Sequence, residues 1–148
     1  WNVHHDPSAA NRCAALESLV LTNQDVIPYI VRRLRDVHPK VRSTALRLLQ
    51  QIPLENLTPD QCASIIGAGL SDRCKETYNA TAILICTRWM KSVKYDPIAL
   101  LSVLKPSKFE AECEKVILSL LSANAETLRG LSENEVQAFY KNMSKQSS

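Results

Sequence analysis

Cysteine and histidine side chains are the groups of this sequence with the chemistry of nucleophiles or metal ligands. The five cysteines are Cys13, Cys62, Cys74, Cys86 and Cys113. No two of them have the short spacing of a zinc site or of a redox-active pair. Most fall on apolar stripes, where a thiol is inert, so we interpret them as free thiols of a reducing compartment. His4, His5 and Asp6 form a candidate metal-binding triplet, but no Cys or His follows at ligand spacing. We therefore predict no metal, no cofactor, no catalytic residue and no enzymatic activity.

Basic residues are the second group with a chemical role, because clustered cations neutralise phosphates. The whole net charge of +3 arises in residues 1–50, which hold seven Lys or Arg against four Asp or Glu. Between positions 32 and 47 stand six basic residues and one acid: Arg32, Arg33, Arg35, Lys40, Arg42 and Arg47, with Asp36. Such a cluster is typical of sequence-independent DNA binding. It is also the ordinary composition of a solvated helix face.

Some of these charged residues belong to an internal repeat of the sequence. An aspartate is followed by an arginine six residues later at Asp6 and Arg12, and again, thirty residues on, at Asp36 and Arg42. A third copy begins at Asp72, but a tyrosine, Tyr78, stands in place of its arginine. A period of this length predicts stacked helical hairpins.

The elements that must position these residues are helices. Only three glycines occur in 148 residues, too few turn-makers for a sheet protein, and apolar residues recur with helical period. Capping residues and prolines mark the helix starts, including a capping box at Thr58 and Gln61. The predicted helices span residues 8–21, 25–35, 39–52, 59–70, 73–92, 97–104, 108–123 and 132–143. Segment 73–92 is apolar around most of its circumference and is predicted to be the best buried, with Trp89 in the core.

Composition bounds the class of protein. Hydrophobic residues make up 45% and charged residues 22%, which is typical of a folded chain and excludes disorder over most of the length. We expect one segment of a longer solenoid over residues 1–148, with a disordered tail at 144–148. No stretch has the length of a membrane span, and no signal peptide opens the chain. We therefore expect a cytosolic or nuclear protein, excised from a longer parent because it starts at Trp1.

The repeat resembles the HEAT repeat, in which a buried aspartate and an arginine six residues later lie at the corner between the A and B helices. Within that class, residues 6–104 resemble the CAP-G subunit of condensin. The resemblance rests on the stretch from Arg35 to Arg42, on Gly69-Leu70-Ser71-Asp72-Arg73, on Trp89 sixteen residues after Arg73, and on Leu100-Leu101. It implies an α-solenoid of about three and a half HEAT hairpins, with a structural ladder of Asp6, Arg12, Asp36 and Arg42.

The resemblance also implies a function. CAP-G subunits are curved and hold double-stranded DNA in a basic concave groove, with a kleisin segment (CAP-H) that straps it in place, among other condensin subunits in mitotic chromosomes. The expected location is the nucleus, with a cytoplasmic pool. Another class remains open: a HEAT scaffold that binds a partner peptide without DNA.

Candidate DNA-binding residues follow from placing the basic residues on the A and B helices of the HEAT repeat. Lys40 and Arg47 are seven residues apart, so they share one face of the B helix, away from its apolar stripe. Arg73 and Lys75 occupy the equivalent corner of the next repeat, where helix capping is the alternative role, and Arg35 completes the set. Arg42, like Arg12, is expected to pair with the aspartate six residues before it instead of contacting phosphate.

Overall fold

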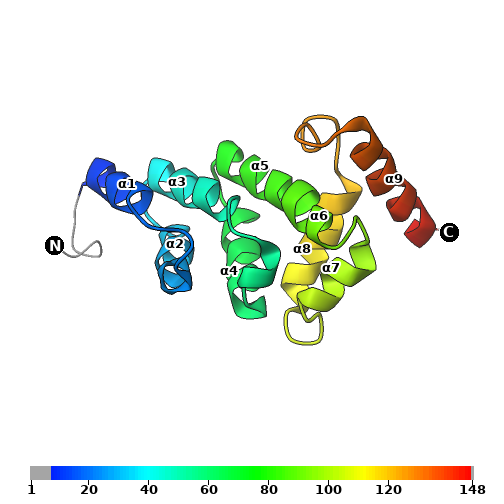
Figure 1. Cartoon of the computed structure of the whole chain (residues 1–148), viewed down its shortest axis with the longest axis horizontal. Coiled ribbons are helices and arrows are strands. Elements are labelled where there is room, and N and C mark those ends of the chain that lie inside the picture. Colours follow the sequence, from blue (N-terminus) through cyan, green and yellow to red (C-terminus); the bar gives the residue numbers. More distant parts are fainter. Residues whose placement is uncertain (1–7, 148) are drawn as a thin grey trace.

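The computed structural model describes residues 8–147, which fold into helices joined by turns, with no strand among them (Figure 1). The helices are α1 (Ala9–Glu17), α2 (Ile27–Arg33), α3 (Pro39–Leu49), α4 (Pro59–Gly69), α5 (Lys75–Ile83), α6 (Met90–Ser92), α7 (Pro97–Val103), α8 (Glu110–Leu121) and α9 (Glu133–Ser147). Short 3-10 turns, η2 (Gln24–Val26) and η3 (Leu54–Asn56), precede α2 and α4. The all-α fold class predicted from the sequence is confirmed.

Side-chain caps fix several helix starts at the predicted places. The Ser8 hydroxyl accepts a hydrogen bond from the Asn11 N–H at 3.3 Å and begins α1. Thr58 and Gln61 form the capping box that their spacing predicts, with reciprocal bonds of 2.9 and 3.1 Å. Asp96 caps α7 by accepting a hydrogen bond from the Ile98 N–H at 3.0 Å. Local sequence therefore determines where these helices begin.

The helices up to α5 lie in two layers (Figure 1). In one layer α1 packs against α3 and α3 against α5, while α2 and α4 pack against each other in the second. The layers are joined by contacts of α2 with α3 and of α4 with α5. Fully buried side chains from successive helices fill the space between them: Ile30, Val41, Leu46, Leu49, Ile65 and Ile66. Each hairpin thus buries its apolar stripe against its neighbours.

The close approach of α4 and α5 depends on Gly69. A Cβ atom at this position would lie 2.1 Å from Oγ1 of Thr81, a residue that is completely buried in α5. At Gly67, in the same helix, an added Cβ would meet nothing within 4 Å. Only Gly69 is therefore required by packing.

Residues 75–92 form one continuous helix, as predicted, but its middle turn is a π-helix, η4 (Leu84–Trp89). Leu84, Ile85, Trp89 and Met90 have no exposed surface, which confirms that this helix is deeply buried and that Trp89 lies in the core. The Thr87 hydroxyl donates to the Ile83 carbonyl at 2.6 Å, within the segment where the backbone widens. A hydroxyl bonded to the carbonyl four residues back commonly bends a helix.

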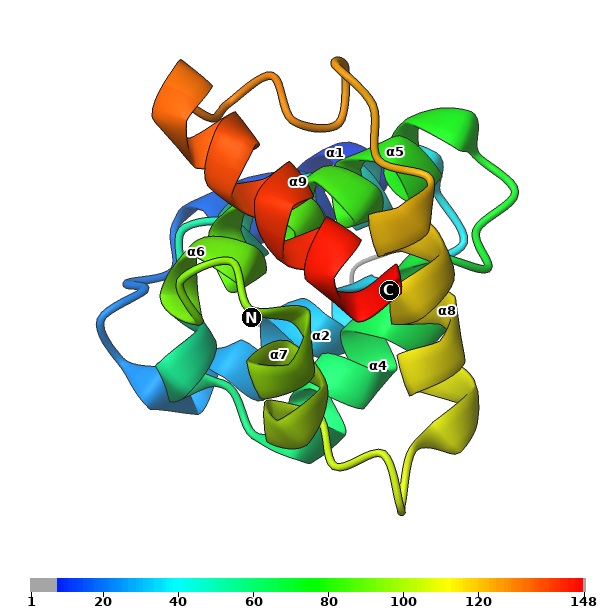
Figure 2. The same cartoon turned by 90° about the vertical axis from the view of Figure 1, so that its right-hand side faces the viewer.

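The packing order changes beyond α6, where α8 lies against α4 and η4 (Figure 2). Lys108, just before α8, lies 3.2 Å from Asp60 at the start of α4, and Lys115 donates to Ser71 after its end at 2.8 Å. These contacts show that α4 and α8 run in the same direction. The α7–α8 pair therefore does not repeat the packing of the earlier hairpins, in which α2 lies against α4 and α3 against α5.

The C-terminal helix α9 reaches Ser147, so residues 144–147 are helical, where a disordered tail was expected. Phe139 is fully buried and Met143 packs against the core. The Asn142 amide donates to the Tyr95 carbonyl at 2.7 Å. These contacts hold α9 against the rest of the molecule. Because no Gly or Pro follows Gly130, the sequence contains no helix-breaking residue before Ser147. In the described part of the chain, none of the helices is long and apolar enough to cross a membrane.

Candidate nucleic-acid interface

Asp36 is the centre of the first charged cluster, at the corner between α2 and α3. Its carboxylate accepts two hydrogen bonds from Arg12 at 2.8 and 2.9 Å, and Arg33 lies 3.4 Å away. The backbone N–H of His38 also donates to it, at 2.9 Å. Burial alone would raise the pKa of Asp36, but the bonds from Arg12 and His38, with the charges of Arg12 and Arg33, lower it below its ordinary value.

Asp72 repeats this arrangement at the corner between α4 and α5. Its carboxylate accepts bonds from Arg42 at 2.7 and 3.2 Å and from the backbone N–H of Cys74 at 2.8 Å. Arg42 also donates to the backbone carbonyl of Asp36, at 2.8 Å. In both clusters an arginine of one hairpin meets the aspartate of the next.

The sequence predicted that Arg42 pairs with the carboxylate of Asp36 in its own repeat, and this prediction is wrong. The six-residue spacing places the Arg42 guanidinium on the carbonyl of Asp36, while its carboxylate partner stands thirty residues further on. Side-chain contacts run along the stack because each corner is presented to the preceding hairpin. Asp6 lies outside the described residues. Tyr78, at the third arginine position, is 41% exposed.

Four cations surround these neutralised aspartates, and we call them the corner cations: Arg35, Lys40, Arg73 and Lys75. All four are exposed, and none makes an ion pair with a residue that the structure describes. Arg35 and Arg73 line one open pocket of about 310 Å³ with Arg42. Lys40 lines a neighbouring pocket of about 280 Å³ beside Cys74 and Glu76. The structure thus brings four of the five predicted DNA-binding residues to adjoining helix corners.

Helix geometry adds to the positive potential at the corners. Lys40 is the second residue of α3 and Lys75 the first of α5. These two helices lie side by side and begin at the same edge of the molecule (Figure 1). The N–H groups at a helix N-terminus carry partial positive charge and favour anions. Both the side chains and the helix ends therefore favour phosphate here.

Arg47, the fifth predicted residue, lies elsewhere. It is near the C-terminal end of α3, two turns from Lys40, and donates to the Glu17 carboxylate of α1 at 2.9 Å. Both side chains of this pair are more than half exposed. The expected row that joined Lys40 and Arg47 to the next corner is thus interrupted, because Glu17 neutralises Arg47.

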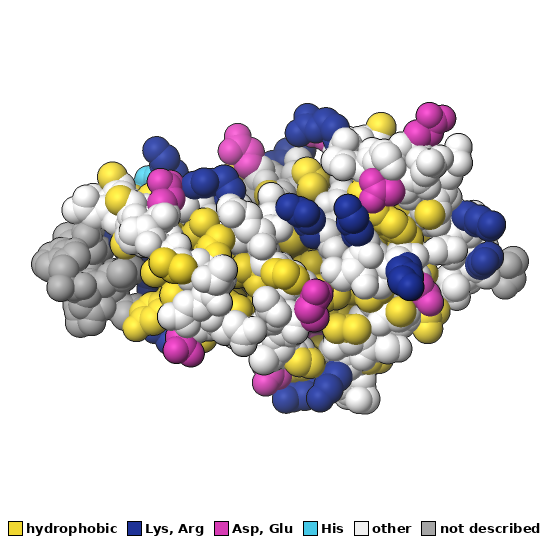
Figure 3. All heavy atoms as spheres, in the orientation of Figure 1, with side chains coloured by type: hydrophobic (Ala, Val, Ile, Leu, Met, Phe, Trp, Pro, Cys, Tyr) yellow, Lys and Arg dark blue, Asp and Glu magenta, His cyan; other side chains and the backbone are white. Residues whose placement is uncertain are grey.

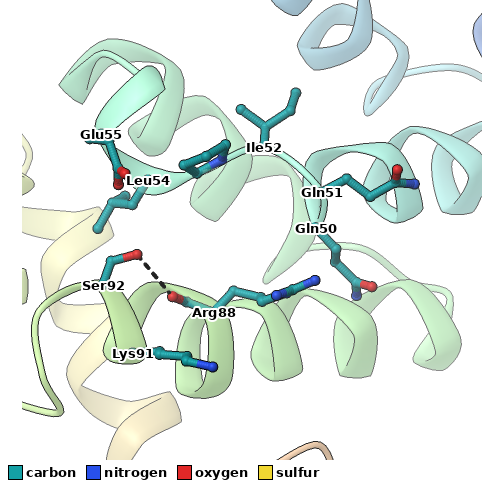
Figure 4. A pocket seen from close by; sticks show the side chains of 9 residues that line it. Gln50, Gln51, Ile52, Leu54, Glu55, Arg88, Lys91 and Ser92 are labelled. Atoms are coloured by element: carbon teal, nitrogen blue, oxygen red, sulfur yellow. Dashed lines mark hydrogen bonds between the residues drawn. The ribbon is translucent and has the colours of Figure 1, made fainter. Parts of the chain in front are cut away.

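A groove that sequence reasoning missed lies between the turn after α3 and the helix η4–α6 (Figure 4). Its volume is about 290 Å³, and both walls carry polar side chains, Gln50 and Gln51 from the turn and Arg88, Lys91 and Ser92 from the helix. Figure 4 shows Arg88 extending toward Gln50. On this face of the molecule, Lys and Arg side chains are scattered among acidic and apolar ones (Figure 3). The groove itself is lined by two cations, Arg88 and Lys91, and one acid, Glu55.

Comparison with known protein families, curated proteins and solved structures gives no match. No group of three or more metal-ligating side chains occurs among the described residues, and the triplet His4, His5 and Asp6 lies outside them. The function must therefore be argued from the geometry of the site.

Proposed function

We propose that this chain is a non-catalytic HEAT-repeat segment of a condensin CAP-G-like subunit, whose corner cations bind the phosphate backbone of duplex DNA. The single observation that carries the DNA-binding part is the arrangement of the corners. Their aspartates are neutralised internally by Arg12, Arg33 and Arg42, which leaves the corner cations available to an external anion. The residue pattern from Asp6 to Leu104 supports the CAP-G-like part.

Binding of this kind is independent of DNA sequence. Lysine and arginine on helix ends contact phosphates, which position a protein on the duplex but carry no base information. A corner with at most four phosphate contacts gives weak affinity and a clear salt dependence. In this proposal a kleisin segment of the CAP-H type adds the further contacts that hold the DNA, and other condensin subunits complete the complex. The proposed location is the nucleus.

The test compares two variants of equal charge. The corner variant carries Arg35→Gln, Lys40→Gln, Arg73→Gln and Lys75→Gln. The control variant carries the same number of neutralisations at exposed sites away from the corners: Lys94→Gln, Lys105→Gln, Arg129→Gln and Lys141→Gln. Fluorescence anisotropy measures the affinity of each for labelled duplexes of unrelated sequence.

The corner variant is expected to lose about tenfold or more in affinity for every duplex, and the control about twofold or less. Equal losses would show that net charge alone drives binding, and would refute the corner site.

A peptide scaffold is the second candidate, favoured by the groove at Gln50 and Arg88. Its side chains offer hydrogen-bond donors and acceptors to an extended peptide. This function predicts that Arg88→Ala weakens binding of a kleisin peptide and leaves DNA affinity unchanged. A wild-type chain that binds the peptide but no duplex would favour the scaffold over the DNA-binding module.

A further inference from the structure

The groove beside Arg88 is longer than the cavity drawn in Figure 4. A second cavity, of about 380 Å³, extends to Glu135 in the first turn of α9. Three residues line both cavities: Gln50, Arg88 and Lys91. The two cavities therefore meet at these side chains, and we call their combined length the Arg88 groove.

Arg88 lies at the centre of this groove, and Figure 4 shows its side chain extending along the groove toward Gln50. It is the single exposed residue between Thr81 and Met90, in a segment that is otherwise buried or half-buried. Its guanidinium makes no ion pair or hydrogen bond with a residue that the structure describes. The N–H donors of this arginine are therefore open to an external acceptor.

Glu135, the acid at one end of the groove, is already engaged. Its carboxylate accepts hydrogen bonds from the Tyr95 hydroxyl at 2.5 Å and from the Ser132 N–H at 2.9 Å, and Lys91 lies 3.8 Å away. Tyr95, and after it Ser132, contribute most to lowering the pKa of Glu135 to about 2, so this carboxylate stays ionised at neutral pH. Glu135 therefore keeps a negative charge at this end of the groove without neutralising Arg88.

Glu55 lies at the other end of the groove. It lines the first cavity, and Figure 4 shows its carboxylate beside Leu54, away from the Arg88 guanidinium. It forms no ion pair with a residue in the described part of the chain. The groove thus carries a free cation at its centre and an acid toward each end. This pattern attracts one anionic group at the centre and disfavours anionic groups on both sides of it.

The turn after α3 supplies groups that suit a peptide backbone. The side-chain amides of Gln50 and Gln51 make no hydrogen bond with a described residue, so each offers two donors and an acceptor. Pro53 adds an exposed apolar surface to the same wall. Backbone N–H and C=O groups need partners of both kinds. This wall therefore suits an extended peptide better than a compact anion such as free phosphate.

We propose that the Arg88 groove binds an extended segment of a partner protein that carries one Asp or Glu side chain, flanked by neutral or basic residues. That carboxylate accepts two parallel, charge-assisted hydrogen bonds from the Arg88 guanidinium. The amides of Gln50 and Gln51 bond the peptide backbone beside it, and the charges of the groove ends exclude a run of acids. This inference rests on the peptide-scaffold function, whose ligand it names, and does not depend on DNA binding.

The experiment selects a random peptide library, displayed on phage, against the full chain after depletion on the variant Arg88→Gln. Depletion removes peptides that bind the corner cations, because that variant retains them. The selected peptides are then synthesised with a fluorescent label, and anisotropy measures their affinity. We expect an Asp or Glu at one fixed position, with no further acids next to it.

Matched variants of the chain and of the peptide test the contact. Arg88→Gln is expected to lower the affinity about tenfold or more, and Arg88→Lys by a smaller factor, because lysine keeps the charge but not the fork of donors. Arg73→Gln, which neutralises an exposed corner arginine, should change the affinity less than about twofold. Replacing the acid of the peptide by its amide should weaken binding to the wild type equally, and leave binding to Arg88→Gln almost unchanged.

The outcomes separate this inference from the function on which it rests. Peptides that lose affinity in Gln50→Ala but have no acidic position, or that carry a run of acids, would overturn the proposed ligand and leave a peptide scaffold. A library that yields no peptide after depletion, or peptides insensitive to all groove variants, would overturn both. Because the Arg88 side chain makes no bond to a described residue, its variants should melt at the wild-type temperature.

Discussion

The pairing of Arg42 with Asp72 leads to a quantitative prediction about stability. The two side chains form two hydrogen bonds, of 2.7 and 3.2 Å, with only 16% and 3% of their surfaces exposed. Asp72→Ala removes both bonds, leaves the guanidinium partly buried without its carboxylate, and takes the acceptor from the Cys74 N–H. We expect a loss of about 3 kcal/mol in the free energy of unfolding, a large part of the roughly 5–15 kcal/mol of a typical domain.

The assay is a double-mutant cycle in urea with Arg42→Ala, Asp72→Ala and their combination. The expected coupling energy is about 1.5–3 kcal/mol, the range for hydrogen bonds to charged groups. The matched control cycle combines Arg42→Ala with Asp36→Ala. Because Arg42 bonds only the backbone carbonyl of Asp36, which alanine retains, this coupling should be below about 1 kcal/mol.

A control coupling as large as that with Asp72 would refute the inter-hairpin ladder and restore pairing within each repeat. Arg42→Ala should also weaken DNA binding much less than it lowers stability, because the ladder arginine is engaged inside the protein. A variant that kept its stability and lost all affinity for DNA would contradict this assignment.

Three further perturbations test other parts of the structure. Gly69→Ala forces a Cβ against Thr81 and should destabilise by about 1–3 kcal/mol, whereas Gly67→Ala, with open space, should stabilise by about 0.5–1 kcal/mol in the same urea titration. Trp89→Ala should cost roughly 3–5 kcal/mol, since the indole is fully buried, and an unchanged melting temperature would show that it is not. Because the folded-state pKa of Asp36 lies below its ordinary 3.8, its contribution is present above that value and is lost as pH falls through the lower folded-state pKa. Acid melts of wild type and Asp36→Asn should therefore converge as the pH falls, and a constant difference would exclude this linkage.

Much of the helical structure was predictable because its determinants are local. The Thr58 capping box and the apolar circumference of residues 73–92 act within a few residues of chain, and both appear as expected. The π-helical turn has no signature in apolar period. The bond from the Thr87 hydroxyl to the Ile83 carbonyl does not mark it either, because Thr44 makes the same kind of bond to the Lys40 carbonyl within the regular helix α3.

The charged contacts were less predictable because they depend on how the hairpins stack. The six-residue spacing identified the ladder arginine Arg42, but one side chain reaches both a nearby carbonyl and a distant carboxylate. The pairing of Glu17 with Arg47 carries the same thirty-residue separation as that of Arg42 with Asp72. A search for opposite charges one period apart would have found this pair.

The salt dependence of DNA affinity tests the central claim most directly. Each phosphate contact contributes about 0.9 to the slope of log affinity against log salt concentration. With three to four contacts, the wild-type chain should therefore show a slope of about −2.7 to −3.6 if the corner cations make them, and the corner variant a slope near zero, with equal values for unrelated duplexes. A corner variant that retains the wild-type slope would contradict the account, because the phosphates would then be bound by other residues.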